Sequence, residues 1–290
     1  MPHDAAQNRI DASDAGAATG STTLGAAVAQ FAPGTDVGVN LETIGGFARR
    51  AAALGASLLV LPEYSSYFTA ELGPSFAEHA QPVDGSFVRG IEALADETGL
   101  HIVVGLVETT PVPERFSNTL VAVAPGEGVV ARYRKVHLYD AFGQRESDWV
   151  VPGETARPET FVVDGLRFGL QTCYDLRFPE STRVLADAGA DVVMVPAEWV
   201  RGPLKEHHWR TLVTARAVEN TVYVLAADHT PPVGVGASMI VDPMGVQLAG
   251  LGEEAGVVVA QLSKQRISDV RAVNPALDLR RYRVEPVSLS

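Results

Sequence analysis

Cysteine is almost missing from this sequence, because the 290 residues contain only one, Cys173. A single cysteine cannot form a disulfide within the chain, so nothing here points to an oxidising compartment. We therefore expect a cytoplasmic protein.

Long hydrophobic runs and basic clusters are missing as well. No stretch reaches the roughly 18 consecutive apolar residues that a membrane span requires, so we expect no membrane partner. Acidic residues outnumber basic ones by 35 to 23, and no Lys/Arg cluster is present that would neutralise a run of phosphates. Nucleic acid is therefore not an expected partner.

The N-terminal segment, residues 1–22, has neither the basic start nor the apolar run of a signal peptide. Its Ala, Asp, Gly, Ser and Thr content predicts a disordered tail. Hydrophobic residues make up 46% of the whole chain and charged residues 20%, which is enough apolar side chain for a sizeable core. No linker interrupts the remainder, so we expect one domain over residues 23–290.

Short β-rich runs alternate with helical stretches from the start of that domain. Leu41, Ile44, Ala48 and Ala51 recur at helical spacing between the first two expected strands, which predicts a β-α-β opening. The expected strands are 23–30, 57–61, 101–107, 118–123, 129–134, 166–171, 191–195, 222–227 and 237–241, and the later helices are 87–98, 179–188 and 205–218. The strands at 101–107, 118–123 and 129–134 follow one another over short connections, which favours antiparallel pairing.

Several of these strands are apolar on both faces, including 58–61, 192–195 and 222–227. Such strands must be covered on each side, by helices on one face and a second sheet on the other. The expected class is therefore α/β, with a four-layer α-β-β-α sandwich.

Glu63 and Lys135 stand where apolar strands end, and strand ends are where open α/β folds build sites. Glu63 follows Leu-Val-Leu-Pro directly, and partial burial there would raise its pKa and make it a usable base. Lys135 ends the run 129–135, where an ammonium beside a nucleophile would stabilise an oxyanion. The plainer alternatives are a Glu that faces solvent or pairs with a neighbour, and a Lys that solvates the surface.

Cys173 lies between a strand and the helix that begins at Pro179. A sharp strand-to-helix turn would expose the thiol to a pocket while main-chain N–H groups point at the same place, as in a nucleophile elbow. The thiol would then be the nucleophile and the N–H of Tyr174 an oxyanion donor. The alternative is a buried structural cysteine, the commoner role of a lone cysteine.

Three segments carry a family resemblance: LVLPEY ending at Tyr64, YRKVHLYD ending at Asp140, and CYDLRFPE beginning at Cys173. Their order and separation closely resemble the signature segments of the nitrilase superfamily, the carbon-nitrogen hydrolases. The segments ESDWVVPG, PAEW, SMIVDPMG and the run 208–228 add to a resemblance that spans about residues 23–282.

The resemblance implies a nitrilase-type sandwich with a catalytic triad of Glu63, Lys135 and Cys173, and with Glu146 as a second glutamate that holds the lysine and the substrate. It also implies a thioester mechanism without a cofactor, and a homodimer. CYDLRFPE is most similar to the branch that includes ω-amidase and deaminated-glutathione amidase.

Arg177 lies about one helical turn past the nucleophile and can fork onto a substrate carboxylate. This favours small monoamides of dicarboxylic acids, such as 2-oxoglutaramate, which yields 2-oxoglutarate and ammonia. The alternative is an Arg177 paired with Glu180 or another local acid. Candidate apolar walls of the pocket are Tyr67, Phe142 and Trp199.

Other functions remain open at this point. Deaminated-glutathione amidase, N-carbamoyl amidohydrolase and true nitrilase share the chemistry, and a binding module on the same scaffold would be the non-enzymatic alternative. The adjacent His207 and His208 do not have the i, i+4 spacing of a zinc pair, so we expect no metal site.

Overall fold

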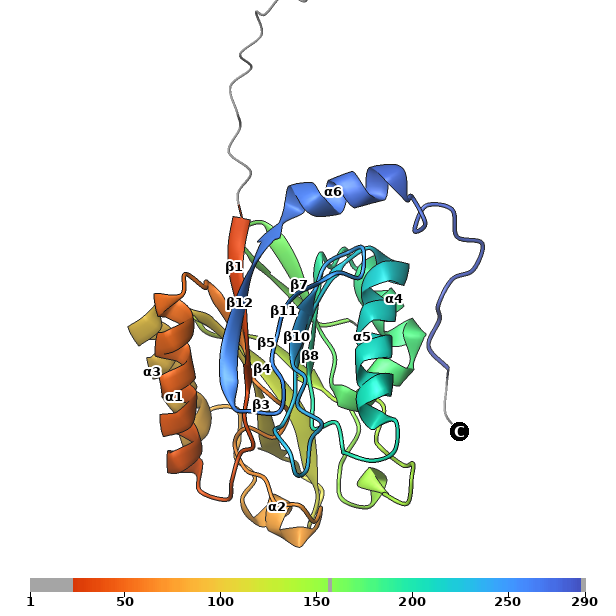
Figure 1. Ribbon diagram of the computed structural model, residues 1–290. Coiled ribbons are helices and arrows are strands. Elements are labelled where there is room, and N and C mark those ends of the chain that lie inside the picture. The colour runs from red at the N-terminus through yellow and green to blue at the C-terminus, as the bar shows by residue number, and fades with distance from the viewer. Residues whose placement is uncertain (1–22, 156–157, 288–290) are drawn as a thin grey trace, which may run out of the picture.

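The computed structural model describes residues 23–155 and 158–287 of the chain. Two six-stranded sheets pack face to face, as Figure 1 shows. The predicted α-β-β-α sandwich is confirmed. The tail predicted for residues 1–22 lies outside the described residues, and the division into a tail and one domain stays a prediction.

The first sheet has the order β12-β1-β2-β3-β4-β5. The strand β1 (Thr23–Gln30) pairs in parallel with β2 (Leu58–Val60), and β2 pairs in parallel with β3 (His101–Thr109), so the predicted β-α-β opening is confirmed. From β3 the chain continues antiparallel through β4 (Phe116–Ala124) and β5 (Gly128–Arg134), as expected. The last strand, β12 (Gly256–Ser263), closes the other edge antiparallel to β1.

The second sheet has the order β11-β10-β9-β8-β7-β6. Its three central strands, β7, β8 and β9, run parallel to one another, and the outer pairs are antiparallel. The bounds are β6 Thr160–Val163, β7 Leu166–Leu170, β8 Val192–Pro196, β9 Tyr223–Ala227, β10 Met239–Val241 and β11 Gln247–Gly250.

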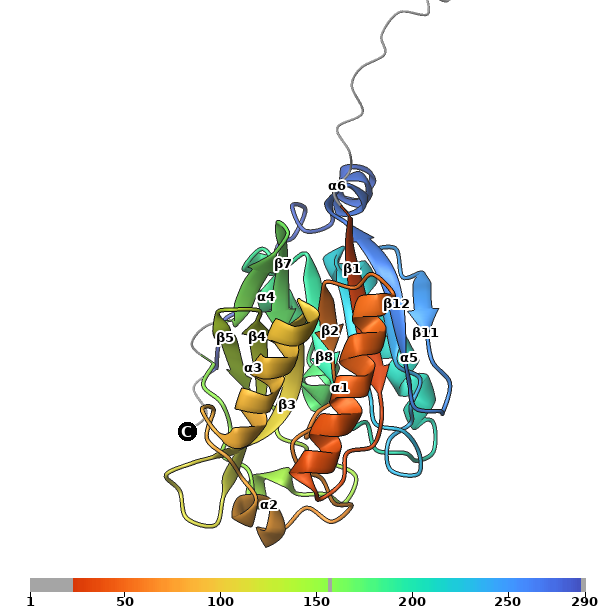
Figure 2. The ribbon, with the colours of Figure 1, turned by 90° about the vertical axis from the view of Figure 1, so that its left-hand side faces the viewer.

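Helices cover the outer face of each sheet. In the described part of the chain, α1 (Val37–Ala53) and α3 (Ser86–Thr98) lie on the first sheet, as Figure 2 shows, while α4 (Pro179–Asp187) and α5 (Lys205–Asn220) lie on the second. Asp36 caps α1 by accepting hydrogen bonds from the N–H groups of Gly38 and Val39. The short α2 (Pro74–Glu78) and the C-terminal α6 (Lys264–Val273) lie beyond these layers.

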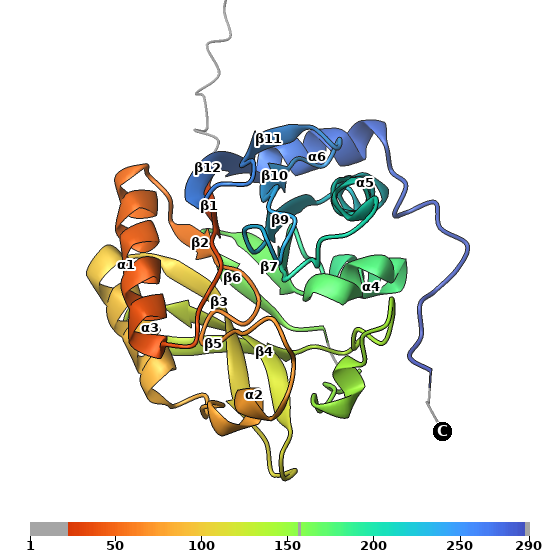
Figure 3. The same cartoon turned by 60° about the horizontal axis from the view of Figure 1, so that its bottom comes forward.

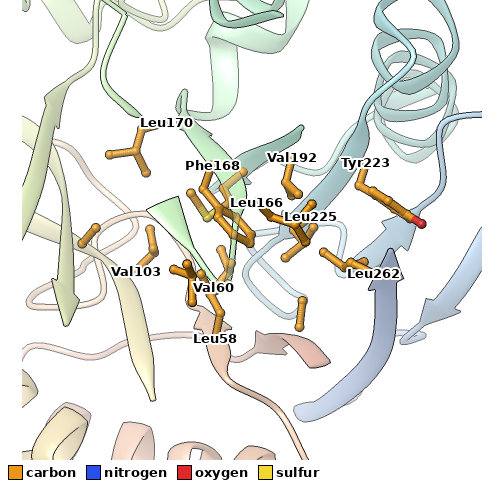
Figure 4. Packing of buried hydrophobic residues seen from close by; sticks show 14 of the residues in the cluster. Leu58, Val60, Val103, Leu166, Phe168, Leu170, Val192, Tyr223, Leu225 and Leu262 are labelled. Carbon is orange, nitrogen blue, oxygen red and sulfur yellow. The ribbon is translucent and has the colours of Figure 1, made fainter. Parts of the chain in front are cut away.

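Alternation along each strand builds three apolar layers. In β1, Ala26 and Val28 face the second sheet, whereas Ala27 and Ala29 face the helices, because successive side chains point to opposite faces. The layer between the sheets contains Leu58, Val60, Phe168 and Leu225, shown in Figure 4. Strands that are apolar on both faces thus have both faces covered, as their sequence requires.

Several elements were not foreseen. The expected strands ended at residue 241, yet β11, β12 and α6 follow, and β6 and α2 occur earlier in the chain. Among the described residues, no helix is both long and apolar enough to cross a membrane.

The parallel strands deliver their carboxyl ends to one edge of the sandwich, the edge that Figure 3 brings forward. The chain leaves β2 toward Glu63, β5 toward Lys135 and β7 toward Cys173. The loop after β8 reaches Glu198 at the same edge.

Candidate active site

Glu63 is buried, with 1% of its surface exposed, and both of its carboxylate oxygens accept hydrogen bonds. Its Oε1 accepts from Asn118 Nδ2 at 2.6 Å and from Lys135 Nζ at 3.0 Å. Its Oε2 accepts from the main-chain N–H of Glu198 at 2.6 Å. Burial raises the pKa of Glu63 above its ordinary value, although Lys135 opposes the shift, so the carboxylate is a stronger base than one in water.

Lys135 lies between two carboxylates. Its Nζ is 3.0 Å from Glu63 Oε1 and 2.9 Å from Glu146 Oε2, and all three side chains are buried. Burial alone would lower the pKa of Lys135, but Glu146 and Glu63 raise it well above the ordinary value, so the ammonium is kept. A buried, permanently charged lysine is suited to stabilising an oxyanion.

Three further hydrogen bonds fix the Glu146 carboxylate beside Lys135. Its Oε1 accepts from the Tyr64 hydroxyl at 2.7 Å and from Asn118 Nδ2 at 3.1 Å. Its Oε2 accepts from the main-chain N–H of Tyr139 at 2.6 Å. Glu146 begins a short 3-10 helix, η1 (Glu146–Asp148). Its N–H also donates to the Tyr139 carbonyl oxygen at 3.3 Å, so the two residues hold the loop 136–146 against the site.

Cys173 begins the 3-10 helix η2 (Cys173–Arg177) with a positive φ of 43°. A non-glycine residue in this region is strained, and here the turn presents the thiol at the edge of the sheet, as the elbow interpretation predicts. Burial, and secondarily Glu63, raises the pKa of the Cys173 thiol well above its ordinary value, against the influence of Lys135. The resting nucleophile is therefore a thiol that needs a base.

Tyr174 lies in the first turn of η2, where main-chain N–H groups have no acceptor within the helix, and it lines the same cavity as Cys173. The predicted oxyanion donor is thus positioned beside the nucleophile. Asp175, which sequence reasoning missed, accepts from the N–H of Thr172 at 2.9 Å and from the Tyr133 hydroxyl at 2.6 Å. It ties the nucleophile turn to β5, the strand that delivers Lys135.

One cavity joins these residues, and Glu63, Lys135, Cys173, Tyr174 and Glu146 all line it. The sequence-predicted catalytic residues are therefore brought together. Asn118 and Glu198 were not predicted. Asn118 appears as an ordinary polar residue within a strand, and only its place opposite both glutamates reveals its role. Glu198 belongs to the PAEW segment, which the resemblance noted without assigning it a function.

Arg177 lies at the wall of the cavity with part of its guanidinium unused. Its guanidinium carbon lies 4.7 Å from the ring centre of Trp199 and 5.5 Å from that of Phe142. Its Nε and Nη2 atoms are buried and have no hydrogen-bond partner in the described part of the chain. Among the described residues, Arg177 forms no ion pair with Glu180 or with another acid, so the alternative of local pairing is wrong.

Lys205 supplies a second cation at the same wall. Its Nζ donates to the Tyr139 hydroxyl at 2.7 Å and lies 3.8 Å from the ring centre of Phe142. Burial, and next the charge of Arg177, lowers the pKa of Lys205. This side of the cavity is thus suited to an anion.

The three predicted walls have different outcomes. Trp199 lines the cavity as predicted. Phe142 is 65% exposed and does not line the cavity, although its ring lies over Arg177 and Lys205, which do. Tyr67 is wrong: its ring stacks on His79 at 4.3 Å and lies outside the cavity lining. The reason is the backbone at Tyr64, whose φ of 56° turns the chain so that Tyr64, not Tyr67, faces the cavity.

The sequence matches the carbon-nitrogen hydrolase family over residues 25–272. The chain belongs to this family. It is 38% identical over 256 residues to deaminated glutathione amidase of Escherichia coli O157:H7, covering 88% of this chain and 97% of that one. It is 32% identical to deaminated glutathione amidase of Rattus norvegicus, over 83% of this chain and 77% of that protein.

Solved structures give the same result. Nit3 of Saccharomyces cerevisiae, a member of the nitrilase superfamily, aligns with a TM-score of 0.78 and 27% identity over 90% of this chain and 97% of its own. An amidase from Nesterenkonia sp. aligns with a TM-score of 0.71 and 30% identity, over 88% and 96%. This carbon-nitrogen hydrolase is therefore an enzyme of the amidase type.

Proposed function

We propose that this enzyme hydrolyses amides of the 2-oxoglutaryl group, at the carboxyl carbon remote from the oxo group, through a thioester on Cys173. The observation that carries the proposal is Arg177, whose buried Nε and Nη2 are unpartnered among the described residues and share a cavity wall with Lys205. A guanidinium with unused donors beside a second cation is suited to a substrate carboxylate. The reacting amide would lie at Cys173, toward the opposite side of the cavity.

Glu63 is assigned as the general base of the first half-reaction. It takes the proton of the Cys173 thiol, and the thiolate attacks the amide carbon. Lys135 and the N–H of Tyr174 stabilise the oxyanion that forms. The carbon-nitrogen bond then breaks, and Glu63 returns its proton to the departing nitrogen, so that a thioester remains.

Hydrolysis of the thioester reverses these roles. Glu63 takes a proton from water, the hydroxide attacks the thioester carbon, and the sulfur leaves as a thiolate that is reprotonated from Glu63. Glu146 holds Lys135 in place throughout. Amide and water are thus converted into a carboxylic acid and an amine or ammonia.

Two substrates share the 2-oxoglutaryl group and differ in what departs. Deaminated glutathione, in which an oxo group replaces the amino group of the glutamyl residue, would release a dipeptide, and the names of the relatives support it. 2-Oxoglutaramate would release ammonia and is the second candidate. We further propose a cytoplasmic location, as the lone cysteine suggested, and a homodimer, as the family resemblance implies.

The test is formation of 2-oxoglutarate from each compound by the purified enzyme and by Cys173→Ala, with ammonia release from glutamine, succinamate and an aliphatic nitrile measured for comparison. We expect turnover of at least one 2-oxoglutaryl amide, and its loss in the variant. A wild-type enzyme that hydrolyses glutamine, succinamate or the nitrile better would contradict the substrate assignment and leave the family assignment standing.

A further inference from the structure

Glu198 places a carboxyl group in the cavity that none of the steps above uses. Its main chain is fully occupied, because its N–H donates to Glu63 Oε2 at 2.6 Å and its carbonyl oxygen lies 3.5 Å from Cys173 Sγ. Its side chain lines the cavity, and Oε1 is buried without a hydrogen-bond partner among the described residues. An unpartnered buried polar atom costs free energy, which a bound ligand can recover.

Glu198 lies between the reacting end of the cavity at Cys173 and its cationic end at Arg177. The main chain of Glu198 touches the nucleophile, and the ring of the next residue, Trp199, stacks on Arg177 at 4.7 Å. The two-residue segment Glu198–Trp199 therefore connects the reacting end of the cavity to its cationic end. An acyl chain with its amide at Cys173 and its carboxylate at Arg177 passes this carboxyl group.

The surroundings of Glu198 favour its neutral form. Burial raises the pKa of Glu198 well above the ordinary value, and the carboxylates of Glu63 and Asp228 add to the shift. The titratable and charged groups that interact with it are Glu63, Tyr64, Glu146, Asp228, Lys135, Cys173, Lys205 and Tyr139, and Arg177 lies in the same cavity. A neutral carboxyl group carries one O–H donor.

We propose that Glu198 determines specificity by donating a hydrogen bond to the 2-oxo group of the substrate, while Arg177 holds the adjacent carboxylate. The inference rests on the proposed function and names the residue that distinguishes an oxo group from other substituents at this carbon. If a methylene group replaces the oxo group, the Glu198 O–H has no acceptor. If an ammonium group replaces it, the N–H donors of the substrate face the O–H donor of Glu198. The opposite case, an ionised Glu198 that binds an ammonium group, would make glutamate the preferred product ligand.

The experiment measures binding of the reaction products, so that it does not depend on turnover. Dissociation constants of 2-oxoglutarate, glutarate and glutamate are determined by calorimetry for Cys173→Ala alone and with Glu198→Gln or Glu198→Ala added. A neutral glutamine keeps an N–H donor of similar reach, whereas alanine removes it. Glu42→Gln, an exposed glutamate on α1, is the matched control for loss of a surface carboxylate.

We expect the Cys173→Ala protein to prefer 2-oxoglutarate over glutarate by about tenfold or more, as loss of one buried hydrogen bond implies. Glu198→Gln should keep this preference, and Glu198→Ala should bring the ratio close to one. A preference for glutamate, an equal ratio in the parent, or loss of the ratio in Glu198→Gln would each overturn the inference.

Failure of the proposed function is recognised separately. If the wild-type enzyme hydrolyses no 2-oxoglutaryl amide but the binding ratio responds to Glu198 as stated, the substrate proposal is wrong and the recognition of the oxo acid holds. If the enzyme hydrolyses a 2-oxoglutaryl amide but the binding ratio of the two diacids does not change in the Glu198 variants, the proposed function holds and only the role of Glu198 is wrong.

Discussion

Gly105 of β3 is the residue whose substitution tests most sharply how the base is positioned. A Cβ atom added there would lie 2.7 Å from the carbonyl carbon of Glu63 and 2.8 Å from its Cα, and closer still to the main-chain nitrogen of Tyr64. All of these are backbone atoms and cannot rotate away. The segment that carries the base must therefore move by about 1 Å, a displacement that costs about 100-fold in rate when reacting groups are aligned.

We expect Gly105→Ala to lower kcat/KM about 100-fold and the free energy of unfolding by about 1–3 kcal/mol, the usual cost of overpacking. Gly46→Ala is the matched control, because a Cβ on this α1 residue meets nothing within 4 Å. The control should keep full activity and gain about 0.5–1 kcal/mol from reduced backbone freedom. Urea unfolding and steady-state kinetics on the same preparations measure both. Full activity in Gly105→Ala would refute the claim that contact with β3 fixes Glu63.

Three further predictions follow from individual contacts. Arg177→Gln should raise KM for a 2-oxoglutaryl amide by about 30-fold or more, because a charge-assisted pair with the substrate carboxylate is lost, while KM for neutral butyramide should change little. The control is Arg50→Gln, at an exposed arginine. Equal effects on both amides would argue against a carboxylate site. Tyr64→Phe removes the 2.7 Å hydrogen bond to Glu146 and should lower the free energy of unfolding by about 1–2 kcal/mol. Tyr67→Phe is the control and should change the free energy of unfolding little, because the Tyr67 hydroxyl makes no hydrogen bond to a described residue. Similar losses of stability in the two variants would argue against a stabilising Tyr64–Glu146 bond. Burial lowers the pKa of His229 to about 4, whereas the unfolded side chain titrates near 6.5, so its contribution to stability is present above pH 6.5 and is lost as the pH falls toward 4. Urea unfolding should show a loss of about 3 kcal/mol in the free energy of unfolding over this pH window. An identical loss in His229→Gln would assign the pH dependence to another group.

The residues at strand ends could be predicted because an apolar strand that stops at a polar residue is visible in the sequence. Glu63, Lys135 and Cys173 each follow such a strand, and the parallel strands carry their ends to one edge. The strands that are apolar on both faces also predicted the layers, because each face must be covered. The residues that bind the site together were harder to find.

Asn118 and Glu198 act through positions that only the tertiary structure defines. Asn118 lies within β4, where its spacing resembles that of any strand residue, and it contacts the two glutamates across 55 and 28 residues of sequence. Tyr67 was misplaced because a positive φ at Tyr64 is a property of the folded chain. By contrast, β12 has an apolar run, Val257 to Ala260, that could have been recognised.

The proposed mechanism requires that Cys173 becomes acylated during amide hydrolysis. Mixing enzyme with a 2-oxoglutaryl amide, quenching with acid during turnover and measuring the intact mass tests it directly. We expect a 2-oxoglutaryl adduct on the wild-type protein, located on the peptide that contains Cys173, and none on Cys173→Ala. Turnover in Cys173→Ala, or an adduct on another residue, would contradict it.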